Sequence, residues 1–418
     1  MPAAADVTAS YRGLFRVSGM PRLVSAALLG RTGQQMGQIA TVLFALDRFH
    51  SPTIAGLYVL LVVLPGLMVA PIAGALLDRR GRTALIMLDY LLAAACGVLV
   101  IGLAVSDVLT PWMLLTIAAV SSLTGPLSNT GTRTLFPLLV PRELWDRANA
   151  IDSGGFVLAI VAGPGIVGVV VATWGTVAGL VATAVMFGLA ALVLVGLADP
   201  PRLARRPTTL LRDARDGLVY VVTNPALRGL AIGVSLSNLG YGIAIVAVPV
   251  LVIDHLHSGA GTVGALWALV GAGGAVSSVI AGRYNSDGRE RHFISGGMAG
   301  ITISLLTLAV APSVAVAALA MIIFGAANGP FDIGLFSLRQ RRTDPAWLGR
   351  AFAVSMALNF CGVPIGSALA GPVLAIGLGT AFAAGAVASV AGAAVILLMI
   401  PPGASEHHVA ARAGHSVT

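Results

Sequence analysis

Two long apolar segments enclose one short charged loop in the stretch IAGLYVLLVVLPGLMVAPIAGALLDRRGRTALIMLDYLLAAACGVLVIGLAV, residues 54–105. Residues 54–77 and 83–105 each exceed the roughly 20 mostly apolar residues that a helix needs to cross the hydrocarbon core of a membrane. The loop between them, residues 78–82, carries one aspartate and three arginines. The stretch therefore predicts two membrane-spanning helices joined by a tight polar turn.

The composition of the whole chain agrees with this pattern. Of the 418 residues, 57% are hydrophobic and only 10% are charged, whereas a soluble domain carries roughly 25% charged residues. The net charge of +8 comes from arginines that lie in short runs between apolar segments, which argues against nucleic-acid binding. Cys96 and Cys361 lie inside apolar segments and indicate neither a disulfide nor a metal site. The first apolar segment is too long for a cleavable signal peptide, so we expect an uncleaved first span.

The chain contains twelve segments long and apolar enough to span a membrane: 23–46, 54–77, 83–105, 110–132, 150–172, 176–197, 229–252, 261–281, 293–311, 313–336, 351–374 and 379–400. We expect an all-α membrane protein with two six-helix halves, residues 23–197 and 229–400. A polar cytoplasmic loop, 198–228, would separate the halves. A cytoplasmic N-terminal segment, 1–22, and a cytoplasmic tail, 401–418, would flank them.

The arginines predict the orientation of these spans. With the N-terminus inside, 23 of the 25 arginines fall in cytoplasmic segments, while Arg48 lies outside and Arg31 lies within a span. Such an excess of basic residues on one side is typical of the cytoplasmic side of a membrane protein. We therefore expect a multi-pass protein of the plasma (inner) membrane with both termini in the cytoplasm.

The two expected halves share a repeat. At a shift of 207 residues, Asp47, His50 and Ser51 match Asp254, His257 and Ser258, and Gly81-Arg82 matches Gly288-Arg289. Membrane transporters are commonly built from such repeats, with the substrate site between them. The repeat favours a transporter over a channel or a receptor.

The loop GALLDRRGR, residues 74–82, resembles the cytoplasmic loop that characterises the major facilitator superfamily. Gly74, Asp78, Arg79, Gly81 and Arg82 occupy its positions, and GRYNSDGR, residues 282–289, is a degenerate copy in the second half. The resemblance implies that Asp78 engages a helix end of the other half and stabilises the outward-open state. It also implies that Asp89 and Arg133 belong with Asp78 to the cytoplasmic gate.

Four further stretches resemble the bacterial drug and siderophore exporters of this superfamily. They are FPLLVPRELWDRANA (136–150), AIVAGPGIVG (159–168), LRDARDGLVYVVTNPALRG (211–229) and LRQRRTDPAWLGRAF (338–352). Gly163, Pro164 and Gly168 resemble the helix motif of antiporters, although Ala159 and Val167 replace two of its glycines. The motif favours export; the alternative is that Gly-Pro simply kinks a packed helix.

A polar stripe on the first span is the candidate substrate site. Arg31, Gln34 or Gln35, and Gln38 share one helical face because they are three and four residues apart. The resemblance implies that the first, fourth, seventh and tenth spans line the cavity; the alternative is an interhelical hydrogen-bond network without cargo. Asn238 and Tyr241 stand at the repeat positions of Arg31 and Gln34. The otherwise apolar lining favours a hydrophobic or amphiphilic small-molecule substrate.

Few carboxylates are available for proton coupling. Gln34 cannot titrate, although related exporters often carry a carboxylate near that position. Asp332 in the tenth span is the leading candidate for proton coupling, and Asp89 in the third span is the second; Asp152 begins the fifth. Arg31 could be the countercharge of Asp332, in which case coupling and a static ion pair are alternatives, as is a role at the helix end.

No catalytic set of nucleophile, histidine and acid is visible, and no histidine has metal-ligand spacing. We expect no enzyme activity, no metal and no cofactor, and we expect a monomer in the lipid bilayer that uses protons as coupling ion. The leading function is proton-driven efflux of small amphiphilic compounds. The alternatives are an importer or facilitator on the same fold, or a receptor or scaffold.

Overall fold

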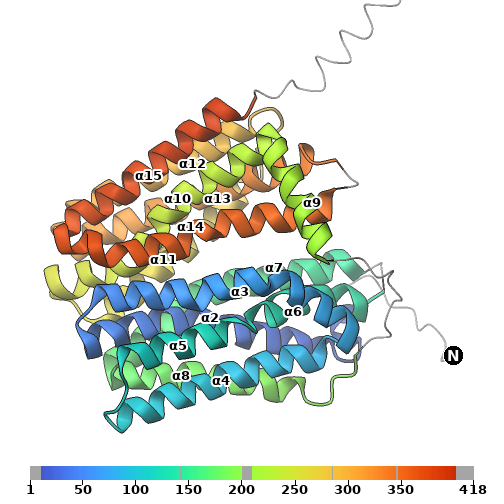
Figure 1. Ribbon diagram of the computed structural model, residues 1–418, viewed down its shortest axis with the longest axis horizontal. Coiled ribbons are helices and arrows are strands. Elements are labelled where there is room, and N and C mark those ends of the chain that lie inside the picture. Colours follow the sequence, from blue (N-terminus) through green and yellow to red (C-terminus); the bar gives the residue numbers. More distant parts are fainter. Residues whose placement is uncertain (1–10, 142–143, 200–209, 285, 345–346, 402–418) are drawn as a thin grey trace, which may run out of the picture. The chain divides into compact units, whose positions relative to one another are not determined.

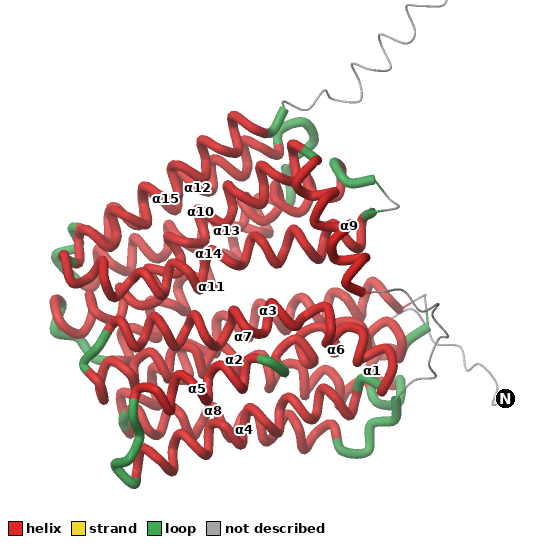
Figure 2. Tube along the Cα trace, viewed as in Figure 1, coloured by secondary structure: helices red, strands yellow, loops and turns green. Residues whose placement is uncertain are grey.

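The regular secondary structure of this chain is helical throughout the residues that its computed structural model describes, 11–141, 144–199, 210–284, 286–344 and 347–401 (Figure 1 and Figure 2). The helices are α1 (Tyr11–Arg16), α2 (Met20–Phe49), α3 (Pro52–Arg80), α4 (Thr83–Val105), α5 (Pro111–Ser122), α6 (Gly125–Leu139), α7 (Trp145–Trp174), α8 (Thr176–Leu194), α9 (Leu210–Thr223), α10 (Pro225–Val250), α11 (Ala260–Ala281), α12 (Glu290–Ala309), α13 (Val314–Arg341), α14 (Leu348–Ile376) and α15 (Leu378–Met399). A π-helical turn, Leu251–His255, continues α10.

Ten of the described helices are long and apolar enough to cross a membrane. Two of the twelve expected spans are not among these ten helices, and the structure shows why for each. Helix α2 has the length, but Arg31 and three glutamines lower its apolar content. The expected fourth span is divided into α5 and α6, and each piece is too short by itself.

Short polar residues mark the points where the helices begin. The Ser51 hydroxyl accepts a hydrogen bond from the Ile54 N–H at 3.3 Å, and Pro52 occupies the first turn of α3. Asn224 caps α10 by accepting from the N–H groups of Ala226 and Leu227 at 3.0 and 3.2 Å. Such caps satisfy N–H groups that have no partner within the helix. The central segment, expected as a loop, thus contains a capped junction between α9 and α10.

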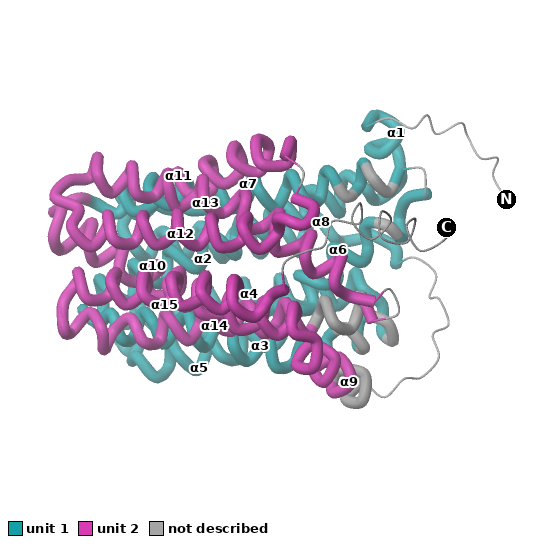
Figure 3. Tube along the Cα trace, turned by 90° about the horizontal axis from the view of Figure 1, so that it is seen from above, with its two compact units in different colours: residues 1–210, 259–268 teal, residues 211–258, 269–418 magenta. Residues whose placement is uncertain are grey.

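The chain divides into two compact units (Figure 3). Unit 1 comprises residues 1–210 and 259–268, and unit 2 comprises residues 211–258 and 269–418. In unit 1, α2 packs against α7 and α8, and α4 packs against α8. In unit 2, α10 packs against α14 and α15, and α12 packs against α13 and α15. Each unit has its own buried apolar cluster, around Phe136 in unit 1 and around Phe331 in unit 2.

Backbone conformations recur at the 207-residue shift found in the sequence. His50, which ends α2, and His257, which follows the π-helical turn, both have φ of 48°, a left-handed conformation that is uncommon outside glycine. Gly81 and Gly288 both have positive φ, at 97° and 69°. Glycine suits these two turns because it lacks the Cβ atom that makes positive φ costly.

Candidate functional site

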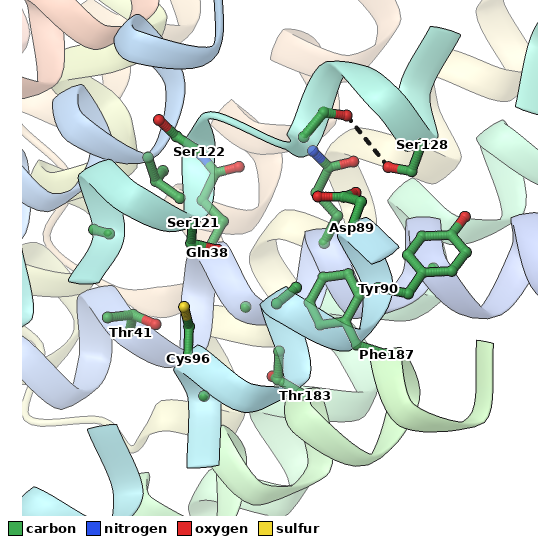
Figure 4. Close-up of a pocket in the computed structure, with 18 of the residues that line it drawn as sticks. Gln38, Thr41, Asp89, Tyr90, Cys96, Ser121, Ser122, Ser128, Thr183 and Phe187 are labelled. Atoms are coloured by element: carbon green, nitrogen blue, oxygen red, sulfur yellow. Dashed lines mark hydrogen bonds between the residues drawn. The ribbon is translucent and has the colours of Figure 1, made fainter. Parts of the chain in front are cut away.

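Unit 1 contains a partly open cavity of about 200 Å³ lined by α2, α3, α4, α5, α6 and α8 (Figure 4). Its polar lining comes mainly from α2, α4 and the broken fourth span, and includes Gln38, Asp89 and Ser121. Valine, alanine and leucine side chains from α3, α4 and α5 supply an apolar part, and Tyr58, Tyr90 and Phe187 supply aromatic rings. The cavity can therefore contact both polar and apolar groups of a small molecule.

The polar stripe predicted on the first span lies on α2, and the structure separates its members. Arg31, Gln34 and Gln38 line the cavity of unit 1. Gln35 lies on the side of α2 that faces α7, because a Cβ atom on Gly163 would stand 2.6 Å from the Cβ of Gln35. The spacing could not distinguish Gln34 from Gln35, since both fit a helical face that contains Arg31 and Gln38.

Arg31 is held by a carboxylate of its own unit. Its guanidinium group contacts the Asp152 carboxylate on α7 at 2.5 Å and donates a second hydrogen bond to the Asp152 backbone carbonyl at 2.8 Å. Both side chains are largely buried, with 9% and 13% of their surfaces exposed. The predicted pairing of Arg31 with Asp332 stays a prediction, and the pairing of Arg31 with Asp152 was not predicted, although Asp152 was one of the few carboxylates named from the sequence.

Asp89 extends from α4 toward the break in the fourth span. Asp89 is 5% exposed, and the hydroxyl groups of Thr124 and Ser128 lie near its carboxylate; Figure 4 shows Ser128 beside it. Helix α5 ends at Ser122 and α6 begins at Gly125. The break follows from Pro126, which lacks the N–H group that would continue the helix. Asp89 thus lies at the start of α6, where helix N–H groups favour negative charge.

The residues of the predicted gate are only partly described, because the surroundings of Gly74 and the side chains of Asp78 and Arg79 lie outside the described part of the chain. The Arg82 side chain donates to the Thr134 hydroxyl at 3.2 Å. Arg133 lies over the ring of Phe156 at 5.4 Å. The expectation that Asp78, Asp89 and Arg133 form one cytoplasmic gate stays a prediction.

Asp199, just beyond α8, was not among the predicted site residues. Its carboxylate accepts hydrogen bonds from the backbone N–H groups of Arg82 and Thr83 at 3.1 and 2.8 Å. It therefore caps the N-terminus of α4, which has no cap from its own side chains. A cap supplied from 116 residues away leaves no local sequence pattern.

The antiporter-like motif lies in the middle of α7, with Pro164 inside the helix. Gly163 packs against α2, so that an added Cβ atom would also lie 3.3 Å from the Met36 nitrogen. Gly168 packs against the first part of α11, and a Cβ atom there would stand 2.7 Å from the Gly264 Cα. The glycines permit close backbone contact on two sides of α7. This packing is compatible both with an antiporter motif and with a Gly-Pro kink in a packed helix.

In unit 2, the predicted polar groups lie on α10 and α13. Asn238 donates to the Asn359 backbone carbonyl at 2.8 Å, and the Tyr241 ring lies 5.8 Å from that of Phe324. Asp332 has an exposed side chain on α13. Among the described residues, no group of three histidine, cysteine or acidic side chains is placed to hold a metal ion.

Comparison with known proteins identifies the family. Residues 14–415 match the sequence family described as transmembrane secretion effector. The chain belongs to this family. One relative is the uncharacterized MFS-type transporter y4rN of Sinorhizobium fredii. It is 38% identical to this chain over 401 residues, which cover 95% of this chain and 98% of the relative. MFS stands for the major facilitator superfamily. The family match and this relative together show that the chain is a multi-pass membrane protein of a transporter family.

Two more distant relatives of this chain have names that state an activity. The multidrug efflux pump Tap of Mycobacterium tuberculosis is 27% identical over 386 residues, covering 87% of this chain and 88% of Tap. The enterobactin exporter EntS of Citrobacter koseri is 28% identical over 393 residues, covering 92% and 89%. The crystal structure of the nucleoside transporter NupG superposes with a TM-score of 0.71 at 13% identity, covering 91% of this chain and 98% of NupG. That likeness shows the fold alone.

Proposed function

We propose that this chain is a secondary active exporter that moves small amphiphilic compounds across the plasma (inner) membrane by alternating access. The observation that carries the proposal is the cavity of unit 1, whose lining combines amides, hydroxyls and one buried carboxylate with aromatic and aliphatic side chains. The names of Tap and EntS support export rather than import. The monomer would span the membrane twelve times, counting α2 and the α5–α6 pair as one span each, with both termini in the cytoplasm.

The proton-motive force is the proposed energy source, and Asp332 is the proposed coupling residue. A coupling carboxylate must exchange protons with water during the cycle. Asp332 keeps accessible surface on α13 although protein atoms surround it, whereas Asp89, the other candidate, is buried beside two hydroxyl groups. We therefore assign coupling to Asp332 and a different role to Asp89.

Transport by the full chain in proteoliposomes tests this function. Vesicles with an acidic interior should accumulate an exchanged compound, because protons leaving the vesicle would drive the compound inward. A panel of small amphiphiles of different charge serves as the probe, and a protonophore should abolish accumulation. Accumulation driven by the opposite gradient would instead identify an importer, and movement that ignores the gradient would identify a facilitator.

A further inference from the structure

Asp89 is a buried acid that meets no basic side chain among the described residues. Among the described residues, no arginine forms an ion pair with it, and Arg31, which lines the same cavity, is engaged by Asp152. The groups that meet the Asp89 carboxylate are the neutral hydroxyls of Thr124 and Ser128. A carboxylate inside the membrane region of a protein is costly unless something neutralises it. The cavity beside Asp89 provides the room for a positively charged ligand.

The size of the cavity limits what such a ligand can be. A protein cavity of about 150 Å³ is known to hold one benzene molecule. At about 200 Å³, the cavity in unit 1 has room for one ring and a few further heavy atoms. A bare inorganic cation would leave most of this space unfilled. An anion would face Asp89, while the arginine that lines the cavity, Arg31, is already engaged by Asp152.

Aromatic side chains add a second attraction for a cation. Tyr58, Tyr90 and Phe187 line the cavity, and the rings of Tyr90 and Phe187 lie 6.2 Å apart. Aromatic faces attract organic ammonium groups, and the attraction grows where water is excluded. Phe187 and Asp89 reach this region from α8 and α4 (Figure 4). The valine and leucine side chains of α3, α4 and α5 can contact an apolar substituent.

We propose that this cavity, formed entirely by unit 1, binds an organic ammonium group carrying one small aromatic or apolar substituent, with Asp89 as its counter-ion. The binding site itself stands on the geometry of unit 1. Only the further statement that the bound compound is cargo rests on the proposed function. Arg31 and Asp152 neutralise each other, so one bound positive charge balances the remaining carboxylate.

Two probes of equal shape test the proposal: benzyltrimethylammonium, which carries a permanent charge, and 2,2-dimethylpropylbenzene, its neutral isostere. Binding to the full chain in nanodiscs is measured against protein-free nanodiscs, which corrects for partition into lipid. We expect the charged probe to bind at least about ten-fold more tightly, a ratio that corresponds to about 1.4 kcal/mol. Asp89→Asn should remove this preference and leave binding of the isostere unchanged. Asp254→Asn, which alters an exposed aspartate, is the matched control.

A measurement on the unaltered protein keeps the test decisive if Asp89→Asn fails to fold. Cys96 lines the cavity, so benzyltrimethylammonium should slow its alkylation by N-ethylmaleimide more than the isostere does at equal concentration. Equal protection by the two probes, or none by the charged one, would overturn the proposal. So would an Asp89→Asn protein that keeps the preference. A site that takes up only a proton would fail the same comparison, because neither probe would bind preferentially.

The same experiments separate this inference from the proposed function. Charge-selective binding without transport would support the binding site and contradict the proposed exporter function. Gradient-driven transport of neutral compounds without charge-selective binding would support the exporter function and contradict the proposed binding site.

Discussion

Arg31 donates a hydrogen bond to the backbone carbonyl of Asp152 at 2.8 Å, and 207 residues further along, Asn238 donates to the backbone carbonyl of Asn359 at the same distance. The first contact joins α2 to α7 and the second joins α10 to α14. The chain thus repeats the contact but places an ion pair in unit 1 and neutral amides in unit 2. The two versions of the contact suggest a direct stability experiment.

Removing one charge of the unit 1 pair should destabilise the protein. Asp152→Asn leaves the Arg31 guanidinium group largely buried without its carboxylate, which costs about 3 kcal/mol or more for buried pairs. Adding Arg31→Asn should restore most of the lost stability, because the double variant reproduces the neutral contact of unit 2. The midpoint temperature of unfolding of the purified protein measures both effects. A double variant as unstable as Asp152→Asn would show that the charge is not what matters.

The close contact between α7 and α2 should not tolerate a side chain at Gly163. A Cβ atom at this position would stand 2.6 Å from the Gln35 Cβ, and forced overpacking costs about 1–3 kcal/mol. Gly154→Ala is the matched control, because no atom lies within 4 Å of an added Cβ there and alanine favours the helix by up to about 1 kcal/mol. We expect Gly163→Ala to lower the unfolding temperature and Gly154→Ala to leave it unchanged or raise it. Equal effects would refute the packing argument.

The orientation inferred from the arginines predicts that the segment containing residue 210 is cytoplasmic. In a background in which serine replaces Cys96 and Cys361, Leu210→Cys should react with a membrane-impermeant thiol reagent only after the cells are permeabilised. His255→Cys, at an exposed position expected outside, should react in intact cells. The reverse labelling pattern would invert the predicted topology.

Asp332→Asn should abolish transport driven by a pH gradient. The amide keeps the shape of the side chain but cannot carry a proton, so cargo binding should survive. Uptake into inverted vesicles is measured together with the yield of folded protein, with Asp254→Asn as the control for loss of one surface carboxylate. Full gradient dependence in the Asp332→Asn protein would end the assignment. A matching loss of yield and uptake would indicate a static structural role instead.

The sequence predicted those features that depend on local composition. Ten of the expected spans are helices of sufficient length and apolar content because hydropathy alone determines them. The break between α5 and α6 was not predicted, although Gly125-Pro126 inside the fourth apolar segment was a usable signal. The hydroxyl-bearing residues from Ser121 to Thr132 in the same segment were a second signal that was not used, and they supply part of the polar lining.

The remaining features depend on residues that are distant in the sequence. The Arg31–Asp152 pair joins positions 121 residues apart, and nothing in either segment specifies the other. The choice between Gln34 and Gln35 requires the direction in which α2 faces α7. The cavity beside Asp89 exists only after six helices are assembled, so it has no counterpart in any single motif.

The hydrogen bonds of Asp199 give the end of unit 1 a mechanical role. Because its carboxylate binds the first N–H groups of α4, the chain leaving α8 is attached at a second point besides its peptide bonds. Tension applied along the connection to α9 is therefore borne partly by α4, the helix that carries Asp89.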